Sequence, residues 1–328
     1  MTTLNAMLGS GRGILVADDG VLAACLESAG MPSAGETQRA CREMLVTTPG
    51  LALGISGVVL GAEALRQRLN DGRTLPAALG DRGLLTGVRA DAGARPLPGT
   101  PGETVTEGLD GLHARLAAWA GLGARFATWR SVVSLGAGRP SWQALHANAH
   151  AFIRFARLCQ DADIVPVVQP ELLAEGPRSR EAISAALLVT LAELGDYGVR
   201  LDGVVLAPSM VLPGPAAPCS GPEAVADQTV AALRCAVPGP LAGVAFLSGA
   251  QSPARATANL AAITRLGAPW PLTFCFGRAL AGPAVTAWRG DTSRLTGGHR
   301  ALANRVACNV AALQGSYAPA LGPSYVLA

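Results

Sequence analysis

The stretch IVPVVQPE at residues 164–171 is a short apolar run, rich in β-branched residues, that ends on a carboxylate. Runs of this length and composition predict buried strands of a parallel sheet. Seven further runs share the pattern and recur along the chain, at 13–18, 54–60, 85–91, 126–133, 203–209, 243–248 and 272–278. Longer stretches with helical character lie between them, at 104–119, 141–160, 179–194 and 221–236.

Eight strands that alternate with helices over 328 residues predict one (β/α)₈ TIM barrel, formed by a single domain over 1–328. The C-terminal ends of the strands in such a barrel meet on the face where active sites lie. Polar residues stand at several of these ends: Asp18, Asp91, Glu171, Ser209, Ser248 and Arg278. The Pro/Gly-rich segments 92–103 and 211–222 predict long loops over that face, and 314–328 predicts a mobile tail or lid.

Lysine is absent from this sequence, so all 26 residues counted as Lys+Arg are arginines. A lysine amine is the side-chain group that forms a Schiff base with a carbonyl, whereas a guanidinium stays protonated and is a poor nucleophile. Covalent catalysis through a lysine is therefore excluded. A GC-rich coding bias and selection against amines both explain the absence, and both explanations stay open.

Composition excludes several other classes of function. The net charge is only +3 and the arginines are dispersed, which argues against nucleic acid binding. No apolar run approaches eighteen residues and no export leader begins the chain, so we expect a soluble, cytoplasmic protein without a membrane partner. Seven scattered cysteines without CxxC spacing predict free thiols in a reducing compartment and no structural zinc.

Several longer motifs are more specific than these patterns. They are GRGILVADD (11–19), PLPGTPGETVTEGLDGL (96–112), WRSVVSLG (129–136), IVPVVQPELL (164–173), the LxGxxLxPxMVxPG frame (201–214), FLSGAQS (246–252), FGRAL (276–280) and RALAN (300–304). Together they resemble class I fructose-bisphosphate aldolase over nearly the full length of the chain. The resemblance implies a TIM barrel, a site shaped for a phosphorylated ketose, no cofactor, and a homo-oligomer, either a tetramer or a dimer.

The sequence departs from this family where the family places its lysines. The Schiff-base lysine of the sixth strand is replaced by Ala207, in LAPSM. The lysine before the Trp-Arg of the fourth strand is Thr128, and a lysine at the end of the third strand is Arg89. These changes imply that the family's covalent mechanism has been lost.

The acidic residues of the family are kept in part. Asp18 of the first strand and the second glutamate of the fifth-strand pair, Glu171, remain. The first glutamate of that pair is Gln169, whose amide cannot exchange a proton at neutral pH. We predict that Asp18 and Glu171 move protons while Arg89 and Arg130 stabilise an enolate or alkoxide, with Gln169 in the same site. Ion pairs among these acids and arginines are the structural alternative.

The phosphate-binding parts of the family are retained. The Ser-Gly pair after the seventh strand is Ser248 and Gly249, and the Gly-Arg pair after the eighth is Gly277 and Arg278. Glycine lets backbone N–H groups approach an anion closely, and arginine donates charge-assisted hydrogen bonds. The basic pair that holds the other end of the sugar is lost at residues 24–25. We therefore expect a small phosphorylated or otherwise anionic carbonyl substrate.

Three other features have plainer explanations. His146 and His150 lie four residues apart on one helix, and without a third ligand we expect both on the solvated exterior. Cys275 lies near the phosphate loop, where a packing role is favoured over a reactive one. A carboxylate metal site at Asp18, Asp91 and Glu171 is disfavoured by the neighbouring arginines, so no metal is expected.

Two functions from different classes follow. The first is an aldolase-like lyase that makes or breaks a carbon–carbon bond, or works through an enol, without a lysine Schiff base. In one variant the substrate carries the amine itself, and Ala207 leaves room for it. The second is a pseudoenzyme that binds a sugar phosphate or a partner protein and catalyses nothing. A metal-dependent aldolase is disfavoured because its histidine ligands would have to lie in strands.

Overall fold

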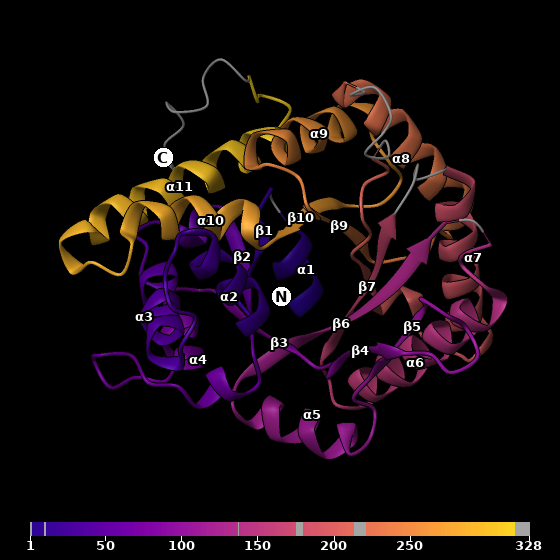
Figure 1. Ribbon diagram of the computed structural model, residues 1–328, viewed down its shortest axis with the longest axis horizontal. Coiled ribbons are helices and arrows are strands. Elements are labelled where there is room, and N and C mark those ends of the chain that lie inside the picture. Colours follow the sequence, from indigo (N-terminus) through magenta and orange to yellow (C-terminus); the bar gives the residue numbers. More distant parts are fainter. Residues whose placement is uncertain (1, 10, 137, 175–179, 213–220, 319–328) are drawn as a thin grey trace.

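The computed structural model describes residues 2–9, 11–136, 138–174, 180–212 and 221–318. In these ranges eight parallel strands close into a barrel in the order β1-β10-β9-β8-β7-β6-β3-β2 (Figure 1). The strands are β1 Gly13–Val16, β2 Ile55–Leu60, β3 Leu85–Arg89, β6 Ala124–Leu135, β7 Val165–Ala174, β8 Val205–Leu206, β9 Gly243–Leu247 and β10 Leu272–Phe276. The predicted (β/α)₈ barrel is confirmed.

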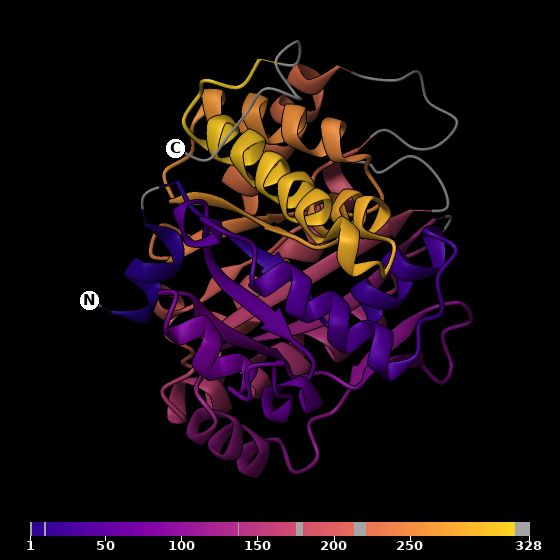
Figure 2. The same ribbon diagram turned by 90° about the vertical axis from the view of Figure 1, so that its left-hand side faces the viewer.

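The helices surround the ring of strands, apart from α1, which lies at its centre in Figure 1. They are α1 Thr3–Leu8, α2 Asp19–Ser28, α3 Gly35–Val46, α4 Leu75–Gly80, α5 Leu112–Gly121, α6 Trp142–Asp161, α7 Arg180–Asp196, α8 Pro222–Ala236, α9 Pro253–Leu266, α10 Arg278–Trp288 and α11 Leu295–Leu313, with 3₁₀ turns at 51–53, 63–66, 201–203 and 292–294. Helix α11 packs along α9 and α10 on the outside of the barrel (Figure 2). The helices predicted at 141–160, 179–194 and 221–236 are present as α6, α7 and α8.

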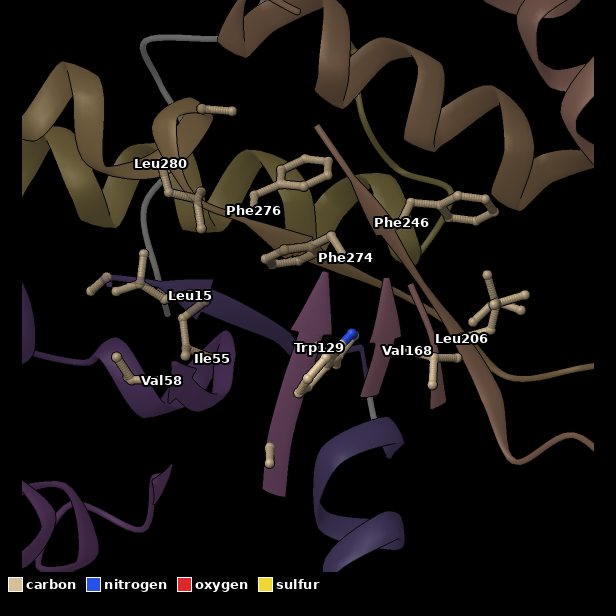
Figure 3. Packing of buried hydrophobic residues seen from close by; sticks show 14 of the residues in the cluster. Leu15, Ile55, Val58, Trp129, Val168, Leu206, Phe246, Phe274, Phe276 and Leu280 are labelled. Atoms are coloured by element: carbon tan, nitrogen blue, oxygen red, sulfur yellow. The ribbon is translucent and has the colours of Figure 1, made fainter. Parts of the chain in front are cut away.

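Alternation along the strands divides the apolar side chains between two layers. Inside the ring, one cluster takes one residue from nearly every strand: Ile14, Val59, Phe126, Val167, Val205, Ala207, Ala245 and Cys275. Their neighbours in sequence face the helices in the larger outer cluster, where Leu15, Val58, Val168, Leu206 and Phe246 lie (Figure 3). Because side chains of a strand point alternately to its two faces, each continuous apolar run fills both layers.

Helix α1 closes the N-terminal end of the barrel. It lies at the centre of the ring in Figure 1, and its Met7 belongs to the interior cluster. The hydroxyl of Ser56 on β2 donates to the carbonyl oxygens of Met7 and Gly13, each at 3.0 Å. This end of the barrel is therefore filled by packing, and the opposite end is open for a site.

One segment differs from its prediction. The loop expected at 92–103 and the helix expected to begin at Thr104 form instead an antiparallel hairpin, β4 Gly93–Pro96 with β5 Thr104–Glu107. Thr104–Thr106 is rich in β-branched residues, which favour strands. The hydroxyls of Thr104 and Thr106 also donate to carbonyl oxygens of β6, at 3.0 and 2.8 Å. The helix that follows, α5, therefore begins only at Leu112.

Other predictions fall largely outside the described residues. The loop at 211–222 is described only at its two ends, and of the tail at 314–328 only 314–318 is described. Helix α11 ends at Leu313, where that tail was predicted to start. None of the helices in the described part of the chain is both long and apolar enough to cross a bilayer.

Candidate active site

A cavity of about 360 Å³ lies at the C-terminal ends of the barrel strands. Nine of the predicted site residues line it: Asp18, Arg89, Arg130, Gln169, Glu171, Ser248, Gly249, Gly277 and Arg278. Ala24 lines it too, with the apolar side chains of Val16, Val21, Leu247 and Cys275. The barrel thus brings together in one space polar residues that are separated by up to 260 positions in the sequence.

Asp18 follows β1 and has two structural partners. Its Oδ1 accepts from the amide of Val21 at 2.8 Å, so it caps the N-terminus of α2. Its Oδ2 lies 3.5 Å from Nη1 of Arg89. Only 6% of Asp18 is exposed, yet it is one of the residues that line the cavity.

Asp91 organises the arginines of the site. Its buried carboxylate accepts from Nη2 of Arg89 at 2.8 Å and from the backbone amides of Arg130 and Gly93, both at 3.1 Å. It therefore fixes the guanidinium of one arginine and the main chain of the other. From the sequence, Asp91 was expected only as a polar residue at a strand end and as part of a disfavoured metal site. Its position two residues after Arg89, at a strand end, is the signal that could have indicated this role.

Arg130 and Glu171 form the second acid–arginine pair. They lie on adjacent strands β6 and β7, and Nε of Arg130 donates to Oε2 of Glu171. The Arg130 side chain keeps 38% of its surface exposed, and that of Glu171 keeps 16%. The ion pairs that sequence analysis kept as an alternative are thus present, but they lie in the wall of the cavity.

The loops after β9 and β10 meet on the other side of the cavity. Gly249 has a φ of +56°, a conformation that favours glycine, and its carbonyl oxygen accepts from Nη2 of Arg278 at 3.0 Å. A Cβ on Gly277 would lie 2.9 Å from Val21, so α2 approaches this backbone as closely as glycine allows. Amides at the start of α10 and a guanidinium beside them form an arrangement suited to an anion.

Gln251 supports this arrangement and was not singled out as a site residue. Its Nε2 donates to the carbonyl oxygen of Ser248 at 3.0 Å, and its Oε1 accepts from Asn259 of α9 at 2.5 Å. The buried Asn259 thereby holds the Ser248 loop from behind. The motif FLSGAQS contains Gln251, but its contact with Asn259 is not readable from spacing.

Gln169 and Cys275 face each other at the base of the cavity. Nε2 of Gln169 lies 3.8 Å from Sγ of Cys275. Burial, with a smaller contribution from the charge of Asp18, raises the pKa of the Cys275 thiol to about 12. At neutral pH Cys275 is therefore a protonated packing residue, which agrees with the preferred interpretation.

Of the three positions where the resemblance implies lysines, Arg89 lines the cavity and the other two do not. Ala207 is fully buried in the interior cluster with Phe126 and Val205, and it does not line the cavity. Thr128 is 2% exposed. The idea that Ala207 leaves room for an amine-bearing substrate stays a prediction, and the burial of this residue does not support it.

Of the two histidines of α6, one differs from its prediction. His150 is exposed, but His146 is half-buried: its Nδ1 lies 2.5 Å from Glu193 and its ring stacks on Trp142 at 3.8 Å. His146 thus belongs to the contact between α6 and α7. Among the described residues no cluster of three or more His, Cys, Asp or Glu is placed to hold a metal ion.

Comparison with known proteins agrees with this geometry. The family model "Fructose-bisphosphate aldolase class-I" matches residues 1–324. A probable fructose-bisphosphate aldolase class 1 of Xylella fastidiosa (strain 9a5c) is 43% identical over 302 residues, 88% of this chain and 89% of the relative. The cytoplasmic isozyme 2 of fructose-bisphosphate aldolase from Pisum sativum is 40% identical over 318 residues, 94% of this chain and 88% of the relative.

A solved structure extends the match to three dimensions. Fructose-bisphosphate aldolase from Plasmodium falciparum superposes with a TM-score of 0.92 at 34% identity, covering 96% of this chain and 94% of that one. At this identity and coverage, similarity reaches beyond the fold. The chain therefore belongs to the class I fructose-bisphosphate aldolase family.

Proposed function

We propose that this aldolase-family protein acts on a small phosphorylated carbonyl compound without forming a Schiff base on lysine. One observation carries the proposal: a single cavity holds an arginine–glycine anion site and two carboxylates, in a chain without any lysine. The protein would then be a divergent member of its family. Bond making or breaking between carbons, or conversion through an enol, is the chemistry that such a site supports.

The anionic group would bind at Ser248, Gly249, Gly277 and Arg278. The backbone amides of the two glycine turns and the guanidinium of Arg278 supply donors there. This would place the carbonyl of a three- to six-carbon reactant toward the acid–arginine pairs. A cavity of about 360 Å³ accommodates a reactant of this size.

Proton transfer would fall to Asp18 and Glu171. Each carboxylate lies in the cavity wall and has an arginine beside it, Arg89 and Arg130 respectively. These guanidiniums would stabilise negative charge on an enolate or alkoxide oxygen without transferring a proton. Gln169 would contribute only hydrogen bonds, because its amide does not titrate.

The same ion pairs favour a second candidate, binding without turnover. Asp18 already caps α2 and contacts Arg89, and Glu171 already accepts from Arg130. Carboxylates held in this way need a change of partner before they take a proton from carbon. A pseudoenzyme that senses a sugar phosphate would keep the anion site and these pairs unchanged.

Exchange of hydrogen for deuterium on dihydroxyacetone phosphate separates the two candidates. Proton NMR in D₂O reports removal of the hydrogen next to the carbonyl, and calorimetry reports binding. Turnover predicts exchange that is lost in Asp18→Asn or Glu171→Gln while binding remains. Binding without exchange in the unmodified protein supports the sensor instead.

Reductive trapping tests the mechanism directly. We expect no mass increase on the intact protein after incubation with dihydroxyacetone phosphate and borohydride. A covalent adduct on any internal residue would contradict the proposal. An unrelated Schiff-base aldolase treated in parallel serves as the positive control for the trapping chemistry.

We further propose that the whole chain works as one barrel domain in the cytoplasm, as a dimer or tetramer without a cofactor. The basis is the family, whose pea relative is named a cytoplasmic isozyme. Light scattering after size-exclusion chromatography gives the number of subunits. A monomer at micromolar concentration would contradict the oligomeric part of this proposal.

A further inference from the structure

We propose that the cavity selects reactants with one anionic group and disfavours those with an anion at each end. This inference rests on the proposed function and adds the class of substrate. It comes from the distribution of charge between two sides of the barrel mouth. The names of the relatives contain a bisphosphate substrate, so this inference gives the chain a substrate preference different from theirs.

The first side is built on β9 and β10. Arg278 is exposed here, and its guanidinium donates to an uncharged group, the carbonyl oxygen of Gly249. In the described part of the chain no carboxylate lies within ion-pair distance of this guanidinium. Its positive charge is therefore available to a ligand at this side.

The second side is built on β3 and β6, which stand opposite β9 and β10 in the ring of eight strands. Two arginines, Arg89 and Arg130, lie here. Three carboxylates contact them: Asp91 after β3, Glu171 on the neighbouring β7, and Asp18, which reaches Arg89 from the end of β1. Two positive and three negative charges leave this side with a net charge of −1. Each guanidinium is already engaged by at least one of the acids.

A second phosphate would meet this negative side. At an effective dielectric constant near 20, like charges several ångströms apart repel by about 1–3 kcal/mol. No compensating cation comes from α2, where Ala24 and Val21 line the cavity with small apolar side chains. Buried Cys25 follows, and burial raises the pKa of its thiol to about 11.

An uncharged, hydroxylated chain suits the second side better. Hydroxyl groups donate to carboxylate oxygens, and a carbonyl or hydroxyl oxygen accepts from a guanidinium. Such a chain makes these hydrogen bonds without adding charge. The reactant that fits both sides is therefore a monophosphate whose remaining carbons carry hydroxyl or carbonyl oxygens.

The test compares two unreactive ligands that differ by one phosphate: a hexitol 1-phosphate and the corresponding hexitol 1,6-bisphosphate. Calorimetry should give a dissociation constant about tenfold higher for the bisphosphate. The ratio should shrink toward one as NaCl rises from 20 to 500 mM, because salt screens the repulsion. Equal or tighter binding of the bisphosphate at low salt overturns the inference.

A charge variant makes the test specific to the second side. Glu171→Gln removes one negative charge with little change of shape and should lower the bisphosphate-to-monophosphate ratio about fivefold. Asp161→Asn removes the same charge from the end of α6, where Asp161 pairs with Arg157, and should leave the ratio unchanged. A ratio unaffected by Glu171→Gln counts against the inference.

These binding experiments give different results if the proposed function is wrong and if only the inference of a single anion is wrong. If neither ligand binds, or if binding survives in Arg278→Ala, the anion site itself is wrong and both proposals fall. If both ligands bind through Arg278 with equal affinity, only the inference of a single anion falls.

Discussion

The guanidinium of Arg278 donates to the carbonyl oxygen of Gly249 across 3.0 Å and so joins the loop after β9 to the start of α10. Strands β9 and β10 are neighbours in the barrel, which brings these residues together although 29 positions separate them. The bond fixes the arginine beside the backbone of Gly249 and Gly277. It provides the geometric basis for treating the two turns as one anion site.

Arg278→Ala should weaken binding of dihydroxyacetone phosphate about 10- to 100-fold, since a hydrogen bond between charged groups contributes about 1.5–3 kcal/mol. Calorimetry measures the change. Because Arg278 is exposed, the free energy of unfolding should change by less than about 0.5 kcal/mol. Arg157→Ala, an exposed arginine of α6, is the control. Unchanged affinity in Arg278→Ala would refute the assignment.

Ala207→Lys should destabilise the protein strongly. Ala207 is fully buried among apolar side chains, so the new amine would lose hydration without a partner, and its pKa would fall. We expect a loss of more than about 3 kcal/mol in urea unfolding. Ala207→Met, similar in length but uncharged, should cost about 1–3 kcal/mol through overpacking. Equal losses in the two variants would mean that the cavity reaches Ala207.

Gly87→Ala tests the packing inside the barrel. A Cβ on this glycine of β3 would lie 2.2 Å from the ring of Phe126, far inside van der Waals contact. The substitution should lower the free energy of unfolding by about 1–3 kcal/mol. Gly80→Ala in α4, where a Cβ meets no atom within 4 Å, is the control. Adding Phe126→Leu to Gly87→Ala should cost less than the sum of the single losses.

His299 should make stability depend on pH. Burial lowers the pKa of His299 below its ordinary value of 6.5, so the unfolded chain binds more protons than the folded one in the window just below 6.5. Stability is therefore highest above that value and is lost as the pH falls through the window. His299→Gln should show a smaller loss between pH 7.5 and 5. His113→Gln, at an exposed position, should behave like the unmodified protein.

Alkylation should distinguish the cysteines. Burial holds the pKa of the Cys275 thiol at about 12, so almost no thiolate is present at pH 8, whereas Cys235 is exposed. Peptide mass spectrometry after brief iodoacetamide treatment should find Cys235 modified and Cys275 intact. Both should react in urea. Rapid native labelling of Cys275 would reveal a reactive thiol in the site.

The barrel could be predicted from the sequence because the apolar pattern of each strand is contained within a few consecutive residues. The run 164–171 and its counterparts are apolar on both faces, as strands buried between an interior and a helical layer must be. The stretch 141–160 was likewise predicted as a helix, and α6 begins after Ser141, whose side chain accepts from the amide of Ala144 at 3.1 Å. The hairpin of β4 and β5 was missed, since Thr104 and Thr106 are fixed by β6, more than twenty residues further on.

The sequence predicted which residues line the candidate site, but not which of them contact one another. Strand-end position and family motifs identified nine residues that line one cavity. The role of Asp91 stayed hidden, because it depends on contacts with Arg89 and with the amide of Arg130. The support of Ser248 by Gln251 and Asn259 depends in the same way on three elements that meet only in the folded chain.

The sequence by itself determined which chemical groups exist: arginines without lysine, short continuous apolar runs, and carboxylates at strand ends. Tertiary structure alone decided how they are used. It buried Ala207 in the interior, engaged Arg89 and Arg130 with acids, and left Arg278 facing the cavity. The reason is physical: periodicity and composition act between near neighbours, whereas burial and charge pairing depend on residues that closure of the barrel brings together.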